Sequence, residues 1–502
     1  MVNHKAMAMA ISVLCNVVQG ELTSVEPTCR AGELCQSQFQ SPYFWPHAHG
    51  HPNYYGNPPW PGPTDLQSSF KWRFNGPTGT LYEESFVGAV IDDKKNIYAN
   101  GDKRVYKLSP DGQLLWTYYT PTAAGANGNA LMDGVLYGDG AEGYVWAVDM
   151  ETGKQKWAVK ASNHNGGEYG HIAAHNGVVV TEGDIKQIPQ GDQMAGNAAC
   201  GTVRGLNGTD GAELWAFYPD GVLWDWFPQF PDGDSVIFME QTGKLYRLWL
   251  NSGKLIWQAG GIAKTWTDGC QMVAANGLVY SVAIDPWSAP CPKSIGGMEE
   301  CPGIVAAYKI SDGSHVWTQK VPKPPNTAPV VGRLGKKDDK LTVVMPIGQQ
   351  SGGCFVEAQL LWQVFPLLGS LPRFVQESIF GVFHSLSIYL GDDYNWLIWG
   401  KMGLTHSIKA FDAETGSPLW TWEGPTNHFR VAPGDRDGYI PRMQAGIRPI
   451  SCPTPWSAPR IGSDGTIFIG NENGNFYAIR DANGDNHIDD AKEVSVYKTK
   501  GV

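Results

Sequence analysis

Residues 145–157 read VWAVDMETGKQKW: a short alternating strand, a turn that contains Thr152 and Gly153, and a second short strand that ends on Trp157. Two such strands joined by a Gly-containing turn predict a β-hairpin. The same pattern recurs along the chain, although less regularly, and ends at Trp116, Trp215, Trp257, Trp317 and Trp420. A segment that recurs in this way indicates one repeated structural unit.

A second pair of strands precedes most of these hairpins. Examples are VGAVIDDKKNIYANG before Trp116, IAAHNGVVVTEG before Trp215 and APRIGSDGTIFIGNENG before Phe476. Each unit then has four strands in about 40 to 60 residues, as a propeller blade does. No stretch with helical periodicity separates the strands, which excludes a barrel of alternating strands and helices. We predict an all-β fold, a β-propeller of four-stranded antiparallel blades.

The number of blades follows from counting these units. Six hairpins end on tryptophan, the stretch IGSDGTIFIGNENGNFYAIRD adds a seventh unit, and GGCFVEAQLLW, which ends at Trp362, adds a truncated eighth. We predict eight blades, with seven as the alternative. Trp72 in SSFKWRF resembles an isolated closing strand, and such a strand can pair with the last blade and remove its free edge.

Residues 147–157 resemble the eleven-residue tryptophan docking motif of the pyrroloquinoline-quinone-like, or quinoprotein alcohol dehydrogenase-like, propellers. Residues 410–420, AFDAETGSPLW, repeat the motif, and degenerate copies extend the resemblance over about residues 66–500. The resemblance implies that the Ala, Gly and Trp of each copy pack one blade against the next.

Three segments and one insertion divide the chain. Residues 1–20 resemble a secretory signal peptide, because one lysine precedes an apolar stretch that ends in small residues. Residues 21–65 are a lead-in rich in Pro, His and aromatic residues, and residues 66–502 form the propeller. The apolar segment 359–391 does not fit the repeat. It is an extra subdomain, a partner-binding patch or translated non-coding sequence.

Composition limits the partners. The chain has 502 residues, of which 42% are hydrophobic and 17% charged, enough apolar material for a large core. Its net charge of −11 without basic runs argues against a nucleic-acid partner. No apolar window of about 20 residues follows the N-terminus, so no transmembrane segment is expected. We expect a monomer that is secreted or lies in the secretory-pathway lumen.

Two kinds of modification fit that location. Eight of the nine cysteines remain once the signal peptide is removed, and an even number predicts disulfides, although the pairing stays open. The sequon Asn207-Gly208-Thr209 lies in a predicted turn and predicts a glycoprotein.

The loops that enter the first strand of each blade are expected to meet at one mouth of the central channel. Their polar residues would form a mostly acidic ring that favours a cation or an amine-bearing ligand. These candidate cofactor-binding residues are Glu84, Asn127, Glu168, His171, Asp225, Asp268 and Asn326. In the lead-in, His47, His49 and His51 alternate, an arrangement that suits zinc or copper. The same stretch also resembles the lead-in that precedes such propellers.

Residues 481–493, DANGDNHIDDAKE, resemble an EF-hand loop with oxygen ligands at its first, third and fifth positions. Position 6 is Asn486 rather than Gly, and the acid expected at position 12 comes one residue late. We predict a structural Ca²⁺ site formed by Asp481, Asn483, Asp485, the His487 carbonyl, Asp489 and Glu493.

Two classes of function follow. The first is a non-catalytic propeller that acts as a binding or scaffold module for a protein, a glycan or a small molecule. The alternative, implied by the resemblance, is a dehydrogenase that uses pyrroloquinoline quinone (PQQ) bound with Ca²⁺ in the central funnel. The chain has no adjacent cysteine pair, which several of these enzymes carry, and no catalytic position can be matched, so the catalytic residues are unknown. Fold alone does not separate the two classes.

Overall fold

The structure is a computed structural model. It describes residues 41–51, 55–74, 76, 89–101, 103–122, 128–163, 172–186, 199–223, 225–261, 267, 272–284, 302–325, 327–334, 340–348, 375, 405–426 and 455–498.

These residues form seven four-stranded antiparallel sheets, each made of four consecutive strands. The first three sheets contain β1 (Val90–Ile91), β2 (Ile97–Asn100), β3 (Arg104–Leu108) and β4 (Leu114–Tyr119); β5 (Ala130–Met132), β6 (Val135–Gly140), β7 (Tyr144–Asp149) and β8 (Gln155–Lys160); and β9 (Ala173–His175), β10 (Val178–Lys186), β11 (Ala199–Asn207) and β12 (Glu213–Phe217). The next two contain β13 (Gln229–Asp232), β14 (Ser235–Met239), β15 (Lys244–Trp249) and β16 (Leu255–Gly260); and β17 (Val273–Ala275), β18 (Leu278–Ile284), β19 (Gly303–Lys309) and β20 (His315–Val321). The last two contain β21 (Val330–Gly332), β22 (Thr342–Gly348), β23 (His406–Asp412) and β24 (Pro418–Glu423); and β25 (Arg460–Ile461), β26 (Ile467–Gly470), β27 (Asn475–Ile479) and β28 (Val494–Lys498). The described helices are short: η1 (Ala141–Gly143) and α6 (Asp490–Glu493).

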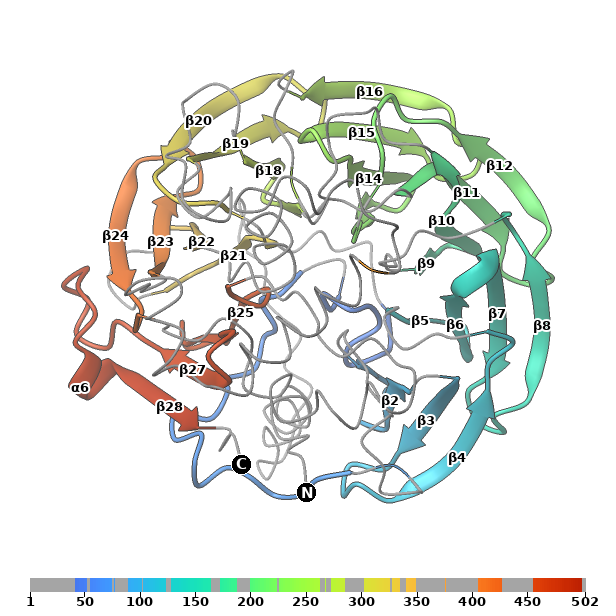
Figure 1. Ribbon diagram of the computed structural model, residues 1–502, viewed down its shortest axis with the longest axis horizontal. Helices are drawn as coiled ribbons and strands as arrows, with labels where there is room; N and C mark the ends of the chain where they lie inside the picture. The colour runs from blue at the N-terminus through green and yellow to red at the C-terminus, as the bar shows by residue number, and fades with distance from the viewer. Residues whose placement is uncertain are drawn as a thin grey trace.

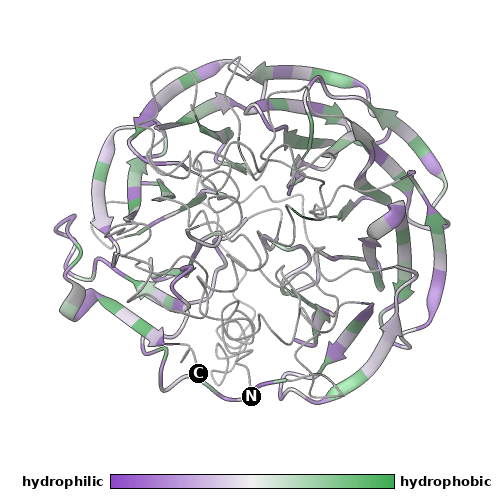
Figure 2. Ribbon diagram, viewed as in Figure 1, coloured by the Kyte–Doolittle hydropathy of each residue, from purple (hydrophilic) through white to green (hydrophobic). Residues whose placement is uncertain are grey.

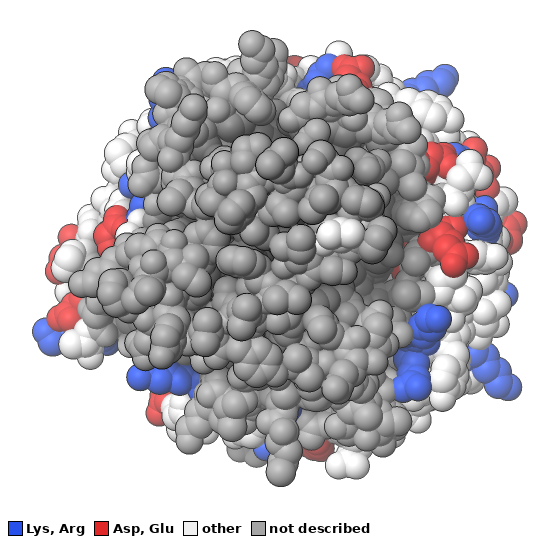
Figure 3. Space-filling model, viewed as in Figure 1, with Lys and Arg blue, Asp and Glu red and all other residues white. Residues whose placement is uncertain are grey.

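The sheets stand around a common centre, with the fourth strands β4, β8, β12, β16, β20 and β24 on the circumference (Figure 1). This arrangement confirms the predicted all-β propeller of four-stranded blades. Apolar and polar residues alternate along the outer strands (Figure 2), as expected where one side of a strand packs on its neighbours and the other meets solvent. Acidic and basic side chains are interspersed around the edge of the face in Figure 3.

The described blades number seven, so the expected count of eight is corrected to the alternative. The reason is a connection within one sheet. β22 pairs directly with β23, for example Gly348 with His406, although 57 residues separate these two partners in the chain. In the sequence, Trp362 falls between these two paired strands, outside the described residues. The connection between them, which includes the apolar segment 359–391, lies outside the described residues apart from Val375.

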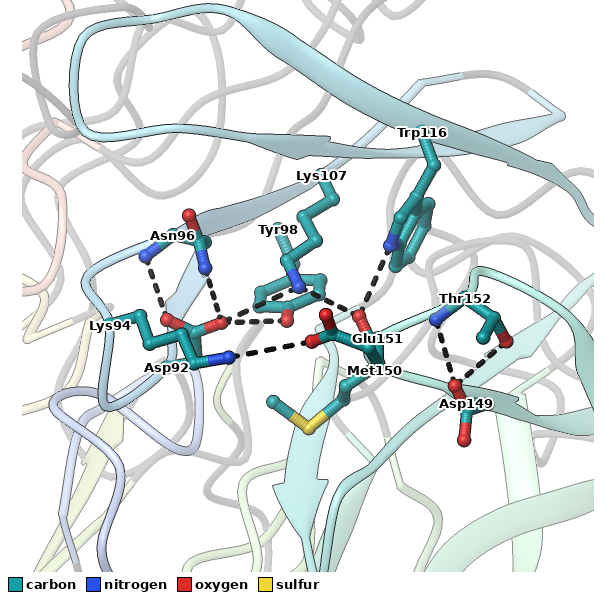
Figure 4. Close-up of polar contacts among 10 residues, drawn as sticks. All are labelled: Asp92, Lys94, Asn96, Tyr98, Lys107, Trp116, Asp149, Met150, Glu151 and Thr152. Carbon is teal, nitrogen blue, oxygen red and sulfur yellow. Dashed lines mark hydrogen bonds and ion pairs between the residues drawn. The ribbon is translucent and has the colours of Figure 1, made fainter.

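The seam between the first two blades shows how the repeat packs (Figure 4). The indole Nε1 of Trp116 donates to the carbonyl of Met150 at 3.1 Å, and Lys107 Nζ donates to the same oxygen at 2.8 Å. Gly153 has φ +69°, and a Cβ there would lie 2.8 Å from the indole. Glycine is required because it both adopts this conformation and lets the ring approach.

The same contact recurs at the next four seams. The indole N–H groups of Trp157, Trp215, Trp257 and Trp317 donate to backbone oxygens of the following blade, those of Gly208, Leu250, Ile310 and Ala413. The packing role that the resemblance implies for the Gly and Trp of each motif is therefore confirmed.

Trp72 makes this contact with the first blade. Its Nε1 donates to the Pro110 carbonyl at 3.0 Å, and its ring lies against Gly112. Just before it, Phe70 stacks on Tyr497 of β28 with ring centroids 6.3 Å apart. The predicted closing segment thus lies between the last and first blades. It contacts β28 through side chains, because residues 66–69 form a turn and no strand pairing is described there.

The antiparallel order gives the ring two different faces. Connections between the first and second strands and between the third and fourth strands lie at one end of each blade, and most are tight turns such as residues 150–154. We call this end the tight-turn face. Connections between the second and third strands, and those that lead to the next blade, lie at the other end, the long-loop face. No helix of the described residues is long and apolar enough to cross a membrane.

Candidate functional site

The predicted channel-mouth residues belong to connections on the long-loop face. Asp225 is the one that lies among the described residues; it is half-buried between β12 and β13 and has φ +44°. The other six, Glu84, Asn127, Glu168, His171, Asp268 and Asn326, lie outside the described residues. The proposed ring is therefore still a prediction.

A set of buried polar residues that the sequence analysis did not select lies at the same end of the blades. Each lies on the second strand of its blade or directly after it, between the middle of the strand (Glu182) and the residue that follows it (Glu240 and Asn471). These residues are Asn100, Asp139, Glu182, Glu240 and Asn471, and all are buried. Their common place is visible in the sequence once the strands are aligned, because NIYANG, VLYGDG, VVVTEG and VIFMEQ each carry a polar residue fifth.

The first two residues of this set link one blade to the next. Asn129, just before β5, donates from Nδ2 to Asn100 Oδ1 at 2.6 Å. Thr181 of β10 donates from Oγ1 to Asp139 Oδ2 at 3.1 Å. These bonds satisfy buried polar groups at the rim of the ring and fix the relative position of neighbouring blades.

Glu240 has a different environment, since its hydrogen-bond partner lies in its own turn. The Thr242 backbone N–H donates to Oε2 at 3.1 Å, and the Thr242 hydroxyl donates to Oε1. Gly221, from the loop that leads into the fourth blade, lies directly against the carboxylate and leaves no room for a side chain. Burial raises the pKa of Glu240, and the bonds from Thr242 oppose that effect in part.

The seam between the sixth and seventh blades holds a fully buried acid–histidine pair. His406, the first residue of β23, lies 3.2 Å through Nε2 from Glu472 Oε1, and neither side chain is exposed. The Asn471 side-chain nitrogen lies 3.1 Å from the other ring nitrogen, Nδ1. The imidazole is therefore held from both sides, and Trp456 lies edge-on to its ring. A buried imidazole next to a carboxylate can hold or transfer a proton.

Part of the lead-in lies at the centre of the ring. Residues 43–51 and 55–60 lie inside the circle of blades, where Figure 1 shows short blue segments. Trp45 pairs with Ile91 through both backbone bonds, 2.9 and 2.8 Å, and the Pro46 carbonyl accepts from Leu131 at 2.9 Å. Opposite them, the Gly56 carbonyl accepts from Ile461 at 2.8 Å. The lead-in therefore acts as an internal element of the fold.

The histidines of the lead-in take part in this packing. His47 Nε2 lies 3.0 Å from the Ala174 carbonyl, and the His49 ring lies on Phe227 with centroids 3.6 Å apart. Burial lowers the pKa of His47, His51 and His175 to about 4, and the neighbouring imidazoles add to the effect for His47 and His51. All three are neutral at pH 7. Among the described residues, which include these histidines and residues 481–493, no group of three or more His, Cys, Asp or Glu side chains is arranged to hold a metal ion.

The predicted Ca²⁺ loop lies between β27 and β28, where other blades have a short turn. Asp481 Oδ1 accepts from Gly484 N at 2.7 Å and Oδ2 from Asn486 N at 2.9 Å. Glu493 is buried and accepts from Ala482 N at 2.8 Å through Oε1 and from Asp489 N at 2.9 Å through Oε2. The acids thus hold the loop in a curled shape through its own N–H groups.

A quinone bound with Ca²⁺, which the resemblance implies, can be compared with these residues. Asp139, Glu240 and Glu472 lie on three separate blades, and each is engaged by a neighbouring side chain. Among the described residues, these acids are therefore not gathered into a group that fits a Ca²⁺–quinone centre.

Four-stranded blades joined by tryptophan docking define a β-propeller whose repeat is similar to that of the pyrroloquinoline-quinone-like propellers. Residues 101–279 match the family model described as outer membrane protein assembly factor BamB, which confirms the resemblance seen in the motif.

Individual relatives are distant. The tetrathionate hydrolase of Acidithiobacillus ferrooxidans is 21% identical over 428 residues, which cover 78% of this chain and 73% of that protein. A europium-containing methanol dehydrogenase is similar in structure with a TM-score of 0.51 and 13% identity, over 88% of this chain and 84% of that one. BamB from Moraxella catarrhalis has a TM-score of 0.44 and 13% identity, over 80% of this chain and 85% of that one. At this identity the likeness to the dehydrogenase shows the fold alone.

Proposed function

We propose that the protein is a secreted or luminal binding and scaffold propeller, whose long-loop face recognises a protein, a glycan or a small ligand. One observation carries this proposal: at the centre of the ring the lead-in occupies edges of first strands, through backbone bonds of Trp45, Pro46 and Gly56. Binding is therefore assigned to the face formed by the long connections, where loops on a rigid scaffold commonly carry recognition. The match to a family described as an assembly factor supports a scaffold role.

The ligand chemistry follows from the charge of that face. Asp139, Glu182 and Glu240 are buried at its rim, and the predicted mouth residues add further acids. Such a rim favours a cation or an amine-bearing group.

The second candidate is an enzyme. The relation to a tetrathionate hydrolase favours it, and a PQQ-dependent oxidoreductase is the form that the family resemblance supports. The test is a titration of the purified protein with PQQ and Ca²⁺, followed by absorbance and by dye-linked oxidation of alcohols, with tetrathionate hydrolysis measured in parallel. We expect no turnover in either assay. Turnover in one of them would replace the scaffold function by that activity.

The proposed secreted or luminal location of the protein can be tested at the sequon Asn207-Gly208-Thr209. Asn207 ends β11 on the tight-turn face and is half-buried, and its Oδ1 accepts from Thr209 N at 2.8 Å. If the chain passes through a eukaryotic secretory pathway, we expect a glycan that an N-glycosidase removes and that Asn207→Gln abolishes. A mass spectrum of the native protein would report this mass together with the mature N-terminus and the disulfides.

We further propose the Ca²⁺ site in residues 481–493 as a structural one. Asp481 Oδ2 and Asp485 Oδ1 each accept one backbone N–H and keep a lone pair, so both residues can still ligate a cation. The site would stiffen the long turn of the last blade.

A further inference from the structure

The lead-in contacts the first strands of the ring as a peptide ligand would contact its site. Trp45 and Pro46 bond to the first two blades, as described above. His47 lies against Ala174 of the third blade, and the Tyr55 hydroxyl accepts from Phe230 N of the fourth at 2.7 Å. Innermost strands have a free edge of N–H and C=O groups, and an extended segment can satisfy them.

The same segment reaches the last two blades from the other side. Gly56 packs against Val330 of the sixth blade. In the seventh blade, Arg460 donates to the Ala48 carbonyl at 3.1 Å and lies over the Trp45 ring, 5.7 Å from its centroid. Burial lowers the pKa of Arg460 to about 10, so it stays charged at neutral pH. The lead-in is thus held by backbone hydrogen bonds, by its buried aromatic side chains and by the Arg460 guanidinium.

Beyond the centre, the segment continues outward along the last blade. Gly62 lies against Phe468 of β26, Leu66 N donates to Ser495 Oγ of β28 at 3.3 Å, and Phe70 stacks on Tyr497. Trp72 then enters the docking position of the first blade. The segment 43–72 therefore forms a seam between the last blade and the first.

Among the described residues, no strand joins the last blade to the first. The first and last sheets are each built from four consecutive strands, and neither borrows one from the other. A ring of blades without an exchanged strand has a weak point where the chain's ends meet. Contacts at this point come from residues 62–72.

We propose that residues 43–51 and 55–72 are an internal peptide ligand that closes the ring, and that the space inside the first strands where residues 43–51 and 55–60 lie, here called the channel, is a peptide-binding site. The site takes an extended segment with aromatic anchors, in the first place this segment itself. Supplied as a separate peptide, residues 41–74 bind the same channel once the covalent copy is free to leave.

The test uses the full chain with a protease site placed between Phe74 and Ala89, outside the described residues. After cleavage we expect the N-terminal fragment to co-elute with the ring on size exclusion. A labelled synthetic peptide 41–74 in excess should then exchange into the nicked protein with saturable binding. The uncut protein is the control, and it should take up at least tenfold less peptide because its channel is filled.

Two variant peptides distinguish binding in the channel from non-specific binding. A peptide with Trp45→Ala loses a fully buried anchor and should bind at least tenfold more weakly. A peptide with Ser68→Ala changes an exposed residue and should bind like the original. The proposal is overturned if the uncut and nicked proteins bind equally, or if the Trp45→Ala peptide binds as well as the original. It is also overturned if the fragment leaves at once and the ring keeps its melting temperature.

If the nicked chain does not fold, the intact protein still gives an answer. In a Trp45→Ala variant, hydrogen exchange of the backbone amides of Ile91, Leu131 and Ile461 should accelerate at least tenfold, because all three bond to the segment. Unchanged exchange at these amides would overturn the proposal.

Discussion

The indole Nε1 of Trp157 lies 3.0 Å from the carbonyl oxygen of Gly208 in the next blade, and its ring covers Gly211. Trp157 therefore packs in the seam between two blades, donates to a backbone carbonyl there, and holds the turn that contains both Gly208 and Gly211.

Replacing this tryptophan should open the seam. We expect Trp157→Ala to lower the free energy of unfolding by about 3 to 5 kcal/mol, since a large buried side chain and its hydrogen bond are both lost. Trp249→Ala is the matched control, because Trp249 is half-exposed on β15. It should cost less than about 1 kcal/mol. Urea denaturation measures both, and equal losses would contradict the docking role.

The glycines of the turns allow the indole contact to be separated from backbone strain. Gly211 and Gly177 have nearly the same φ, +77° and +78°, but a Cβ at Gly211 meets Trp157 at 2.8 Å whereas one at Gly177 meets nothing within 4 Å. Gly177→Ala should cost about 1 kcal/mol from the backbone alone. Gly211→Ala should cost about 1 to 3 kcal/mol more through overlap. Thermal denaturation of the two variants tests this, and a larger loss for Gly177→Ala would refute it.

Acid should weaken the centre of the ring. His47, His51 and His175 have a pKa of about 4 in the folded protein, against about 6.5 in the unfolded chain, so the unfolded state binds more protons between these values. Stability is complete above pH 6.5 and falls as the pH drops toward 4, by up to about 3 kcal/mol for each fully buried histidine. Asp133, Asp232 and Asp234 near His175 reduce its share.

Urea midpoints from pH 4 to 8 measure this dependence. His47→Gln should flatten the curve between pH 6.5 and 4, and His315→Gln, at an exposed position on β20, should leave it unchanged. A curve that rises toward acid would contradict the assignment.

The buried pair in the sixth seam should depend on both partners. We expect His406→Leu to destabilise the protein by about 3 to 5 kcal/mol, because Glu472 would be left buried without this partner. The double variant His406→Leu with Glu472→Leu should recover most of that loss. If the double variant is as unstable as the sum of the single changes, the two groups do not act as a pair.

Calcium should stiffen the turn of the last blade. At millimolar Ca²⁺ we expect binding heat and a higher melting temperature, both of which Asp481→Ala with Asp485→Ala should remove. The control is Asp111→Ala with Asp210→Ala, which removes two exposed acids from turns of other blades. The absence of heat and of any thermal shift in the wild type would show that the loop binds no calcium.

The sequence determined the blade. Each hairpin ends on a tryptophan and turns on a glycine, and those residues are local, so the alternation and turn chemistry of residues 145–157 predict both the strands and the seam. The buried polar residues of the second strands could also have been found there, since NIYANG, VLYGDG and VVVTEG each carry one at the fifth position.

Only the tertiary structure decided how many blades there are and what fills their centre. Trp362 reads as the end of a blade, but β22 and β23 pair across it, and pairing between distant strands leaves no local mark. The lead-in, rich in Pro and His, reads as an exposed tail or a metal site. Within it, His47 contacts Ala174, and Ala48 accepts a hydrogen bond from Arg460. Arg460 is 412 positions further along the chain than Ala48. Contacts of that span depend on the closure of the whole ring, and no periodicity in the chain encodes them.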